Sequence, residues 1–461
     1  MSLRNRRKLA EGFTLIELMV SMSAGVMVSL AVVALSREAS NSFHEETRVA
    51  SAEMQIRTAM DRLRADVQRA AYMSTGNIWI DPTIRSVNGV IGAGTNVAAI
   101  PASFNSATHM SLSTLAGIRL FAGGSVAGAP VSAVNGLSPD AIELGGYFTN
   151  VEELAVGGGT GTVAVQAGGS CTGQQINLDV NSSPSIWRLV GLGIIASDAG
   201  AEGGAGNYDT LMNNAFQPVE GSPFIVRITD STGKSQFAAT CPGASGTIGA
   251  AMWAGSAGAP AVYIDPTTPI SVPGAGGTNA TINPIQIVRW QLEPAVIADP
   301  MPGNGPKYDL TRTYVDAKGT LILSSREVVA EYAVDLKFAF TVDDTSDTSG
   351  NYAGASNSSL KVLSFEDSAG NQAAGADPTT VGANADGPQR IRSVRVRLTT
   401  RVATPDRSEP LDAGTDYVYR YCTASTGDAS AECVAGNPVF ARTRTLISEV
   451  SLPNQARFWY R

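Results

Sequence analysis

Histidine is nearly missing from this sequence, and the common catalytic motifs are missing altogether. Its 461 residues include two histidines, His44 and His109, so acid–base catalysis by histidine has few groups to work with. No GxSxG, HExxH or CxxC occurs, which removes frequent signatures of hydrolases, zinc peptidases and thiol oxidoreductases. The glycine-rich stretches also lack the GxxxxGK[ST] pattern that cradles phosphates. We therefore expect no enzymatic activity and no cofactor.

Cysteine is also scarce, and its spacing argues against a metal site. The four cysteines are Cys171, Cys241, Cys422 and Cys433, and with two histidines in the chain a Cys/His zinc site lacks ligands. We expect a short disulfide between Cys422 and Cys433 and a longer one between Cys171 and Cys241. Three pairings are possible in principle, and four unpaired buried thiols are the alternative.

Charged residues make up 16% of the chain, and the net charge is −8. No broad cationic surface for phosphates is expected, so nucleic acid is not an expected partner. The arginines that do cluster alternate with apolar residues, which predicts a half-buried strand with a basic face. They are Arg390, Arg392, Arg395, Arg397 and Arg401.

One acidic run offers a weak candidate for a metal site. Asp343, Asp344 and Asp347 lie in the sequence DDTSDTSGN, and oxygen side chains that converge in a turn suit Ca²⁺. The run has no glycine at the turn position and no late glutamate, both of which the common calcium loop requires. We therefore expect a solvated acidic loop and no metal.

The sequence does contain one long apolar segment close to its start. The 23 residues Phe13–Leu35 carry a single charge, Glu17, and as a helix they span about 34 Å, enough to cross a bilayer. The eleven Leu, Ile, Phe and Val residues contribute about −3 to −7 kcal/mol to insertion, which outweighs about +3 kcal/mol for one acidic side chain. Basic residues precede the segment, so we expect the leader in the cytoplasm and everything after Arg37 outside.

Three interpretations of this segment compete. A cleaved secretory signal has an apolar core of about 7–15 residues, which is shorter than this one, although Ala31 and Ala34 before Ser36 imitate a cleavage site. A plain signal anchor explains the length and the orientation. It leaves Glu17 unexplained, however, because a charged group in an apolar helix usually has a partner.

The third interpretation accounts for Glu17. The sequence GFTLIEL at residues 12–18, after a short basic leader, resembles the class III signal of type IV pilins and of type II secretion pseudopilins. The resemblance implies that a prepilin peptidase of the inner membrane cuts after Gly12 and methylates the new N-terminal Phe13. It also implies that the carboxylate of Glu17 pairs with the terminal amine of a neighbouring subunit in the fibre.

The helix is expected to continue beyond the membrane. Neither proline nor glycine occurs between Ser36 and Ser74, and Gly76 and Asn77 mark the expected stop. On the polar face, Arg62 and Asp66 are four residues apart and are expected to form an ion pair. An apolar stripe follows the helical period, which fits a coiled-coil seam but more readily a contact with a sheet. Its residues are Val49, Ala52, Ile56, Met60, Leu63, Val67 and Ala70.

After Asn77 the composition favours short strands separated by glycine-rich loops. We predict nine strands from runs of β-branched and aromatic residues. They are Ile142–Phe148, Phe224–Thr229, Ala261–Ile264, Ile285–Leu292, Leu321–Ser324, Leu336–Val342, Leu360–Phe365, Ile391–Thr399 and Leu446–Leu452.

The C-terminal part carries a second resemblance. VVAEYAVDLKFAF at 328–340, RIRSVRVRLTTR at 390–401 and Thr443–Leu452 resemble the end of W-type minor pilins, the PilW family, and of J-type pseudopilins. There a short helical turn leads into one strand, an arginine-flanked strand follows, and a late strand closes the sheet. The implied fold class is α+β and pilin-like, with a long N-terminal helix packed on an antiparallel β-sheet head that carries large loop and β insertions.

This fold divides the sequence into five parts. They are a leader at 1–12, the transmembrane half of the helix at 13–35, its amphipathic half at 36–74, a β-rich insertion at 75–284 and the C-terminal sheet at 285–461.

The function that the resemblance implies is assembly or priming of a type IV pilus as a minor pilin. The chain would span the inner membrane once before assembly and then reach the pilus and the cell surface, supporting twitching motility or adhesion. Its partners would be the prepilin peptidase, other minor pilins and the major pilin. The alternatives are an adhesin or DNA-binding module displayed at the pilus tip, and a J-type pseudopilin of type II secretion.

Overall fold

The fold is known from a computed structural model, which divides into two compact units, Met1–Met54 and Gln55–Arg461. The structure describes residues 13–84, 102–124, 139–148, 153–156, 174–177, 216, 218–219, 222–240, 261–265, 280–295, 307–343, 360–363, 365, 378–381, 387–403, 418–420 and 440–456.

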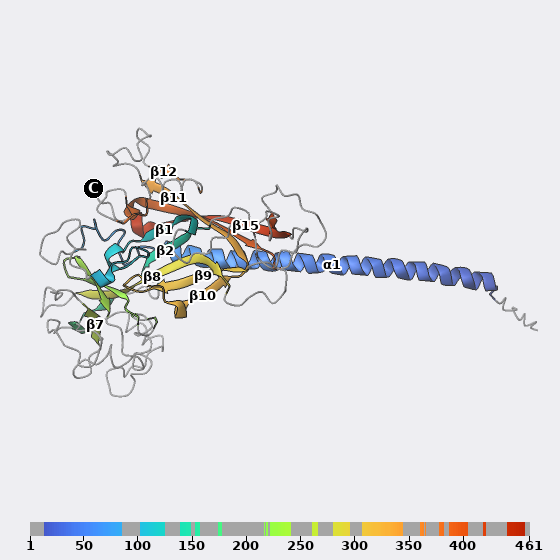
Figure 1. Cartoon of the computed structure of the whole chain (residues 1–461), viewed down its shortest axis with the longest axis horizontal. Coiled ribbons are helices and arrows are strands. Elements are labelled where there is room, and N and C mark those ends of the chain that lie inside the picture. The colour runs from blue at the N-terminus through green and yellow to red at the C-terminus, as the bar shows by residue number, and fades with distance from the viewer. Residues whose placement is uncertain are drawn as a thin grey trace, which may run out of the picture. The chain divides into compact units, whose positions relative to one another are not determined.

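One helix, α1 (Leu15–Gln68), begins in the first unit and ends in the second (Figure 1). In the first unit residues 13–44 are exposed wherever their side chains are described, although Phe13–Leu35 is almost entirely apolar. The helix is long and apolar enough to cross a membrane. The predicted long helix is therefore confirmed, but it ends at Gln68 and not near Ser74.

The second unit contains a sheet of ten antiparallel strands whose long central member is β8 (Thr281–Pro294). The second half of β8 lies between β2 (Ala141–Gly146) and β9 (Tyr308–Val315), and the first half pairs with β5 (Ile225–Thr229). The other members are β1 (Ile118–Phe121), β3 (Leu154–Ala155), β4 (Gln174–Asn177), β6 (Ser235–Thr240), β7 (Ala261–Asp265) and β10 (Glu327–Ala330). Strands from both sides of residue 284 thus share one sheet.

A second sheet has five antiparallel strands in the order β12-β11-β13-β15-β14. Its central strand β13 (Ile391–Arg401) pairs along its length with β11 (Ala333–Asp343) and β15 (Phe440–Ser451). Short edge strands β12 (Leu360–Val362) and β14 (Val418–Arg420) complete it. A short helix, α6 (Pro453–Ala456), follows β15. Among the described residues, 3₁₀ turns also lie at Ala102–Phe104, Leu112–Thr114, Ala122–Gly124, Leu323–Ser325 and Pro388–Arg390.

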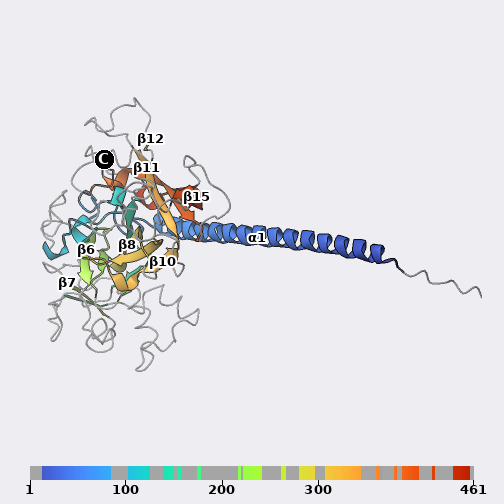
Figure 2. The ribbon, with the colours of Figure 1, turned by 45° about the vertical axis from the view of Figure 1, so that its right-hand side comes forward.

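The last turns of α1 lie between the two sheets, which Figures 1 and 2 draw on either side of the helix. The predicted stripe from Ile56 to Val67 is buried there, in one apolar cluster with Trp290 of the first sheet and with Phe338 and Val396 of the second. Alternation along each strand turns one apolar face toward the helix. The stripe is therefore a core contact and not a coiled-coil seam, and it is covered by two sheets where one was expected.

Two local predictions were wrong. Leu321 forms a single bridge with Val315, and a 3₁₀ turn at Leu323–Ser325 replaces the predicted strand. The Ser325 hydroxyl holds this turn by donating to the Ile322 carbonyl at 2.6 Å. The helical turn expected near Val328 is instead strand β10, because these residues pair with β9. The predicted strands overlapping β2, β5, β7, β8, β11, β12, β13 and β15 are confirmed, with altered ends.

Candidate functional site

The first candidate site is the start of α1, where Thr14 and Glu17 form a capping box. The Thr14 backbone N–H and hydroxyl both donate to Glu17 Oε2 at 3.0 Å, and the Glu17 N–H donates to Thr14 Oγ1 at 3.3 Å. This reciprocal pattern satisfies N–H groups that have no partner within a helix. Sequence analysis missed the role of Thr14, although Thr-x-x-Glu before an apolar run is its known signal.

The box leaves Glu17 able to bind a further partner. The side chain is exposed, both of its hydrogen bonds from Thr14 use Oε2, and a carboxylate accepts up to about four hydrogen bonds. Phe13 precedes the helix and is 86% exposed. Gly12, the predicted residue before the cut, lies outside the described residues. The arrangement therefore combines a helix that starts at Leu15 with a carboxylate available to a neighbouring cation.

The second candidate site holds the end of α1 in the head. Asp66 Oδ2 accepts hydrogen bonds from Trp290 Nε1 at 3.0 Å and from Arg312 Nε at 2.7 Å, in buried surroundings. Burial is the largest influence and lowers the pKa of Arg312, but the charges and hydrogen bonds of Asp66 and Tyr314 together outweigh it and raise that pKa. The pair predicted within the helix does not form, because Arg62 contacts Glu327 at 2.7 Å. Asp66 thus fixes how α1 sits against β8 and β9.

Replacing Asp66 with asparagine should weaken the contact of α1 with β8 and β9. One charge-assisted acceptor is lost while two buried donors remain, so we expect a loss of about 1–3 kcal/mol in the free energy of unfolding. Urea denaturation followed by circular dichroism measures it. The control is Asp61→Asn on the same helix, since Asp61 is exposed and 3.8 Å from Arg64, and such a pair contributes less than about 1 kcal/mol. Equal losses from the two substitutions would contradict the conclusion that Asp66 holds α1 against β8 and β9.

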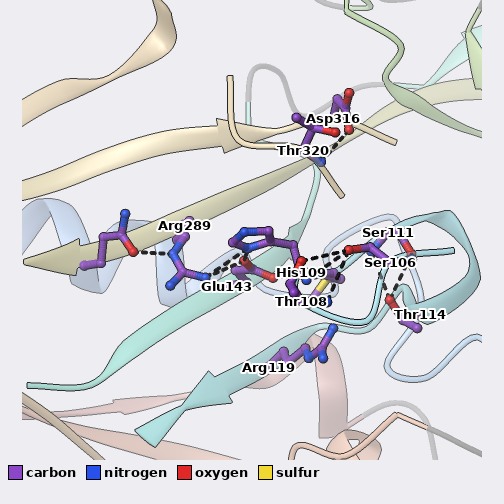
Figure 3. A network of polar contacts seen from close by, with 12 residues as sticks. Ser106, Thr108, His109, Ser111, Thr114, Arg119, Glu143, Arg289, Asp316 and Thr320 are labelled. Atoms are coloured by element: carbon purple, nitrogen blue, oxygen red, sulfur yellow. Dashed lines mark hydrogen bonds and ion pairs between the residues drawn. The ribbon is translucent and has the colours of Figure 1, made fainter. Parts of the chain in front are cut away.

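A third group of polar residues is buried behind the first sheet, where His109 approaches β2 and β8 (Figure 3). Glu143 of β2 and Arg289 of β8 lie opposite each other, and Arg289 Nη1 is 2.9 Å from Glu143 Oε1. His109 Nδ1 is 2.7 Å from the same Glu143 oxygen, and the Met110 N–H donates to the other at 2.6 Å. Burial favours the neutral form of Glu143, but the hydrogen bond from His109 and the charge of Arg289 outweigh it and keep its pKa below the ordinary value.

This network continues along β8. Arg289 donates to Gln291, Gln291 donates to Glu293, and Glu293 pairs with Arg326. Residues 289, 291 and 293 alternate along the strand, so they share the face opposite Trp290. Every charge in the row therefore has a polar partner, which is what burial of charge requires. The network ties the segment around His109 to the sheet.

The buried carboxyl group of Asp140 also joins the two sheets. Asp140, just before β2, pairs with Lys337 of β11 at 2.9 Å, and its backbone N–H donates to the Leu336 carbonyl at 2.7 Å. Burial raises the pKa of Asp140 even though Gly123, Lys337 and Phe338 donate to or attract it. The start of β2 in the first sheet is thus held against β11 of the second sheet by a buried ion pair and a backbone hydrogen bond.

The arginines of β13 are used within the head. Arg392 pairs with Asp343 at 3.0 Å, and Arg397 pairs with Asp335 at 3.2 Å. Arg395 donates to the Leu363 carbonyl at 2.9 Å, and its guanidinium lies over the Phe365 ring. The predicted half-buried strand is confirmed. Its basic groups neutralise acidic neighbours and stack on an aromatic ring.

The remaining predicted site residues are only partly within the described chain. Asp343 belongs to β11 and pairs with Arg392, as above, while Asp344 and Asp347 lie outside the described residues. Cys171, Cys241, Cys422 and Cys433 also lie outside them, so both disulfides stay predictions. Within the described part of the chain, no group of three or more His, Cys, Asp or Glu residues is arranged to hold a metal ion.

Comparison with known proteins adds nothing to this assignment: no family model, no curated protein and no solved structure matches the chain. The class that the fold defines is an α+β protein with a long N-terminal helix capable of crossing a membrane and antiparallel sheets around the end of that helix.

Proposed function

We propose that this chain is a minor type IV pilin of W type, anchored in the inner membrane by α1, cut after Gly12 and methylated on Phe13. One observation carries the proposal. A single helix presents an exposed apolar segment at its start and buries an apolar stripe between antiparallel sheets at its end. Its partners are the prepilin peptidase, other minor pilins and the major pilin, and its role is to help assemble the fibre.

The proposed mechanism centres on Glu17. Cutting after Gly12 frees an amine on Phe13, four residues before Glu17 in the same chain. Inside the membrane an unpaired carboxylate is costly, and in a medium of low dielectric constant the attraction of an ammonium group is strong. A neighbouring subunit's amine therefore neutralises Glu17 as the helices pack. The capping box supports this, because it orients the carboxylate at the end of the helix where that amine arrives.

The mature protein should be shorter and methylated. We expect its intact mass to correspond to the loss of residues 1–12 and the gain of one methyl group on Phe13. Mass spectrometry of protein purified from membranes measures both. Gly12→Val should leave the full-length mass, because the peptidase must approach the backbone closely and only glycine has no side chain. A mature protein that retains its leader would contradict the proposal.

The secretory alternative differs in its phenotype. A J-type pseudopilin belongs to a type II secretion system, so loss of the chain would abolish enzyme secretion and leave twitching intact. Loss of a minor pilin would have the opposite result. Deleting residues 75–284 to test an adhesin role is unsuitable, because this removes β1, β2 and part of β8 from the core around α1.

A further inference from the structure

An amine and a carboxyl are buried against each other where the two sheets meet. Lys337 Nζ of β11 lies 2.9 Å from Asp140 Oδ1, and the two side chains are 12% and 0% exposed. Because a carbon–oxygen bond is about 1.2 Å long, the nitrogen is at most about 4.1 Å from the carboxyl carbon. Reacting atoms are held about 3–3.5 Å apart before a bond forms. The two groups therefore have the chemistry and nearly the separation from which an amide bond forms.

The surroundings of Asp140 favour attack on its carboxyl carbon. The Gly123 N–H donates to Oδ1 at 2.9 Å, and the Phe338 N–H donates to Oδ2 at 3.3 Å. Such N–H groups stabilise the negative charge that develops on oxygen when a nucleophile adds to the carbon. Burial raises the pKa of Asp140 in spite of these donors. The carboxyl therefore takes up a proton more readily, which lets it lose its hydroxyl as water.

A second carboxyl, Asp335, lies two residues before Lys337 and on the same face of β11. Its side chain is 5% exposed, and Arg397 lies 3.2 Å from one of its oxygens, Oδ2. Among the described residues, the other oxygen is buried and has no hydrogen-bond partner. Burial raises the pKa of Asp335 against the charges of Arg397 and Lys337, which makes Asp335 a stronger base. Its unpaired oxygen is available to accept a proton.

Burial also changes which form of the pair is favoured. Removing two ions from water is costly, and replacing a buried ion pair with neutral groups is often neutral or stabilising. An amide is neutral, whereas the ion pair that it replaces is not. Holding two reactants in the right geometry is also equivalent to an effective concentration of about 10⁵–10⁸ M. Both effects favour condensation at this site.

We propose that Lys337 and Asp140 become joined by an amide bond within the folded chain, with Asp335 as the base. The ammonium of Lys337 first gives one proton to Asp140, which leaves an amine and a carboxylic acid. The nitrogen then bonds to the carboxyl carbon, and Asp335 takes a proton from the nitrogen. Asp335 passes this proton to the hydroxyl, the carbon–oxygen bond breaks, and one water leaves. No electrons are exchanged, and the bond fastens the first sheet to the second.

The mass of the full chain tests the bond. After purification in detergent and reduction of any disulfides, we expect the chain to be lighter by one water than its sequence and its N-terminal processing require. Trypsin should not cut after Lys337, and it should yield a branched peptide of residues 120–188 joined to residues 327–361. The internal control is Lys307, which is also buried. Its partner Glu331 is 51% exposed, so the ions stay hydrated, and cleavage after Lys307 should be normal.

Two variants identify the reacting groups. Lys337→Arg keeps the cation but has no amine to act as nucleophile, so it should lose no water. After reduction it should migrate differently from the linked chain in denaturing gels, because no closed loop remains. A positioned base contributes about 10²–10⁴-fold to a rate, so freshly made Asp335→Asn should be mostly unlinked. Asp309→Asn, at another largely buried carboxyl, should leave the linked fraction unchanged.

The unaltered chain decides the proposal without any variant. A folded chain that has lost no water and is cut after Lys337 would overturn it. Water loss that persists in Lys337→Arg would also overturn it, since another pair would then be joined. A normal linked fraction in Asp335→Asn would overturn the role given to Asp335. These results do not depend on processing at Gly12, so the bond and the proposed function stand or fail separately.

Discussion

Replacing Glu17 with glutamine should abolish entry of the chain into filaments while leaving it in the membrane. Glutamine at this position keeps an oxygen that accepts from the Thr14 N–H, so the capping box and the start of α1 persist. It has no charge to offer a partner's amine. We expect little or no surface signal on immunoblots of sheared filaments, and normal cleavage by mass spectrometry. Twitching motility should be lost to the same degree.

Two further variants separate the charge from the cap. Glu17→Ala removes both and should be no more active than Glu17→Gln, if pairing with an amine is the essential contact. Glu46→Ala removes an exposed carboxylate on the same helix, outside the apolar segment, and should assemble normally. Full assembly of Glu17→Gln would show that the charge has no role, and the proposed mechanism would have to be abandoned.

The second large effect is expected at Arg289. Arg289→Met removes the arginine from Glu143, which keeps its contacts with His109 and the Met110 N–H, and breaking a buried ion pair in this way costs about 3–5 kcal/mol in the free energy of unfolding. Glu143 has no exposed surface, and Arg289 is 1% exposed, so solvent relieves little of this cost. Urea denaturation of the full chain in detergent, followed by tryptophan fluorescence, is a direct measurement because Trp290 is adjacent and buried.

The double variant Glu143→Gln with Arg289→Met is the informative comparison. Glutamine has no charge to bury and still offers an oxygen to the Met110 N–H, so we expect recovery of about half the loss or more. Arg62→Ala is the exposed control, since Arg62 and Glu327 are 48% and 41% exposed and their pair contributes about 1 kcal/mol or less. If Arg289→Met lowered the free energy of unfolding no more than Arg62→Ala does, the buried network would not be what holds the segment around His109 to the first sheet.

Two of the buried ion pairs, Asp66–Arg312 and Glu143–Arg289, show why the sequence did not reveal them. Asp66 sits four residues after Arg62, which predicts a pair on the polar face of the helix. The structure instead buries Asp66 against Arg312, 246 residues away in the chain. Glu143 and Arg289 each interrupt an apolar strand, and without the register of β2 on β8 nothing indicates that they meet. Pairing across strands is set by the packing of whole elements, which a local pattern does not contain.

The sequence by itself determined the long helix, its apolar start, the stripe on its later turns and eight of the fifteen described strands. These follow from interactions between residues a few positions apart, through the helical period of 3.6, the strand period of 2 and the length needed to cross a bilayer. It also suggested Gly12, Phe13 and Glu17 as a processing and assembly signal, which the intact mass of the mature protein and the assembly of Glu17→Gln test.

Only the tertiary structure decided that the stripe lies between two sheets, that Asp66, Glu143 and Arg289 are buried in pairs, and that α1 stops at Gln68. Each depends on segments far apart in the chain. The helix end is the clearest case, because its own residues favour continuation and the bonds from Gly145 and Asn454 prevent it. Local preferences differ by about 1 kcal/mol per residue, so a few well-placed distant contacts outweigh them.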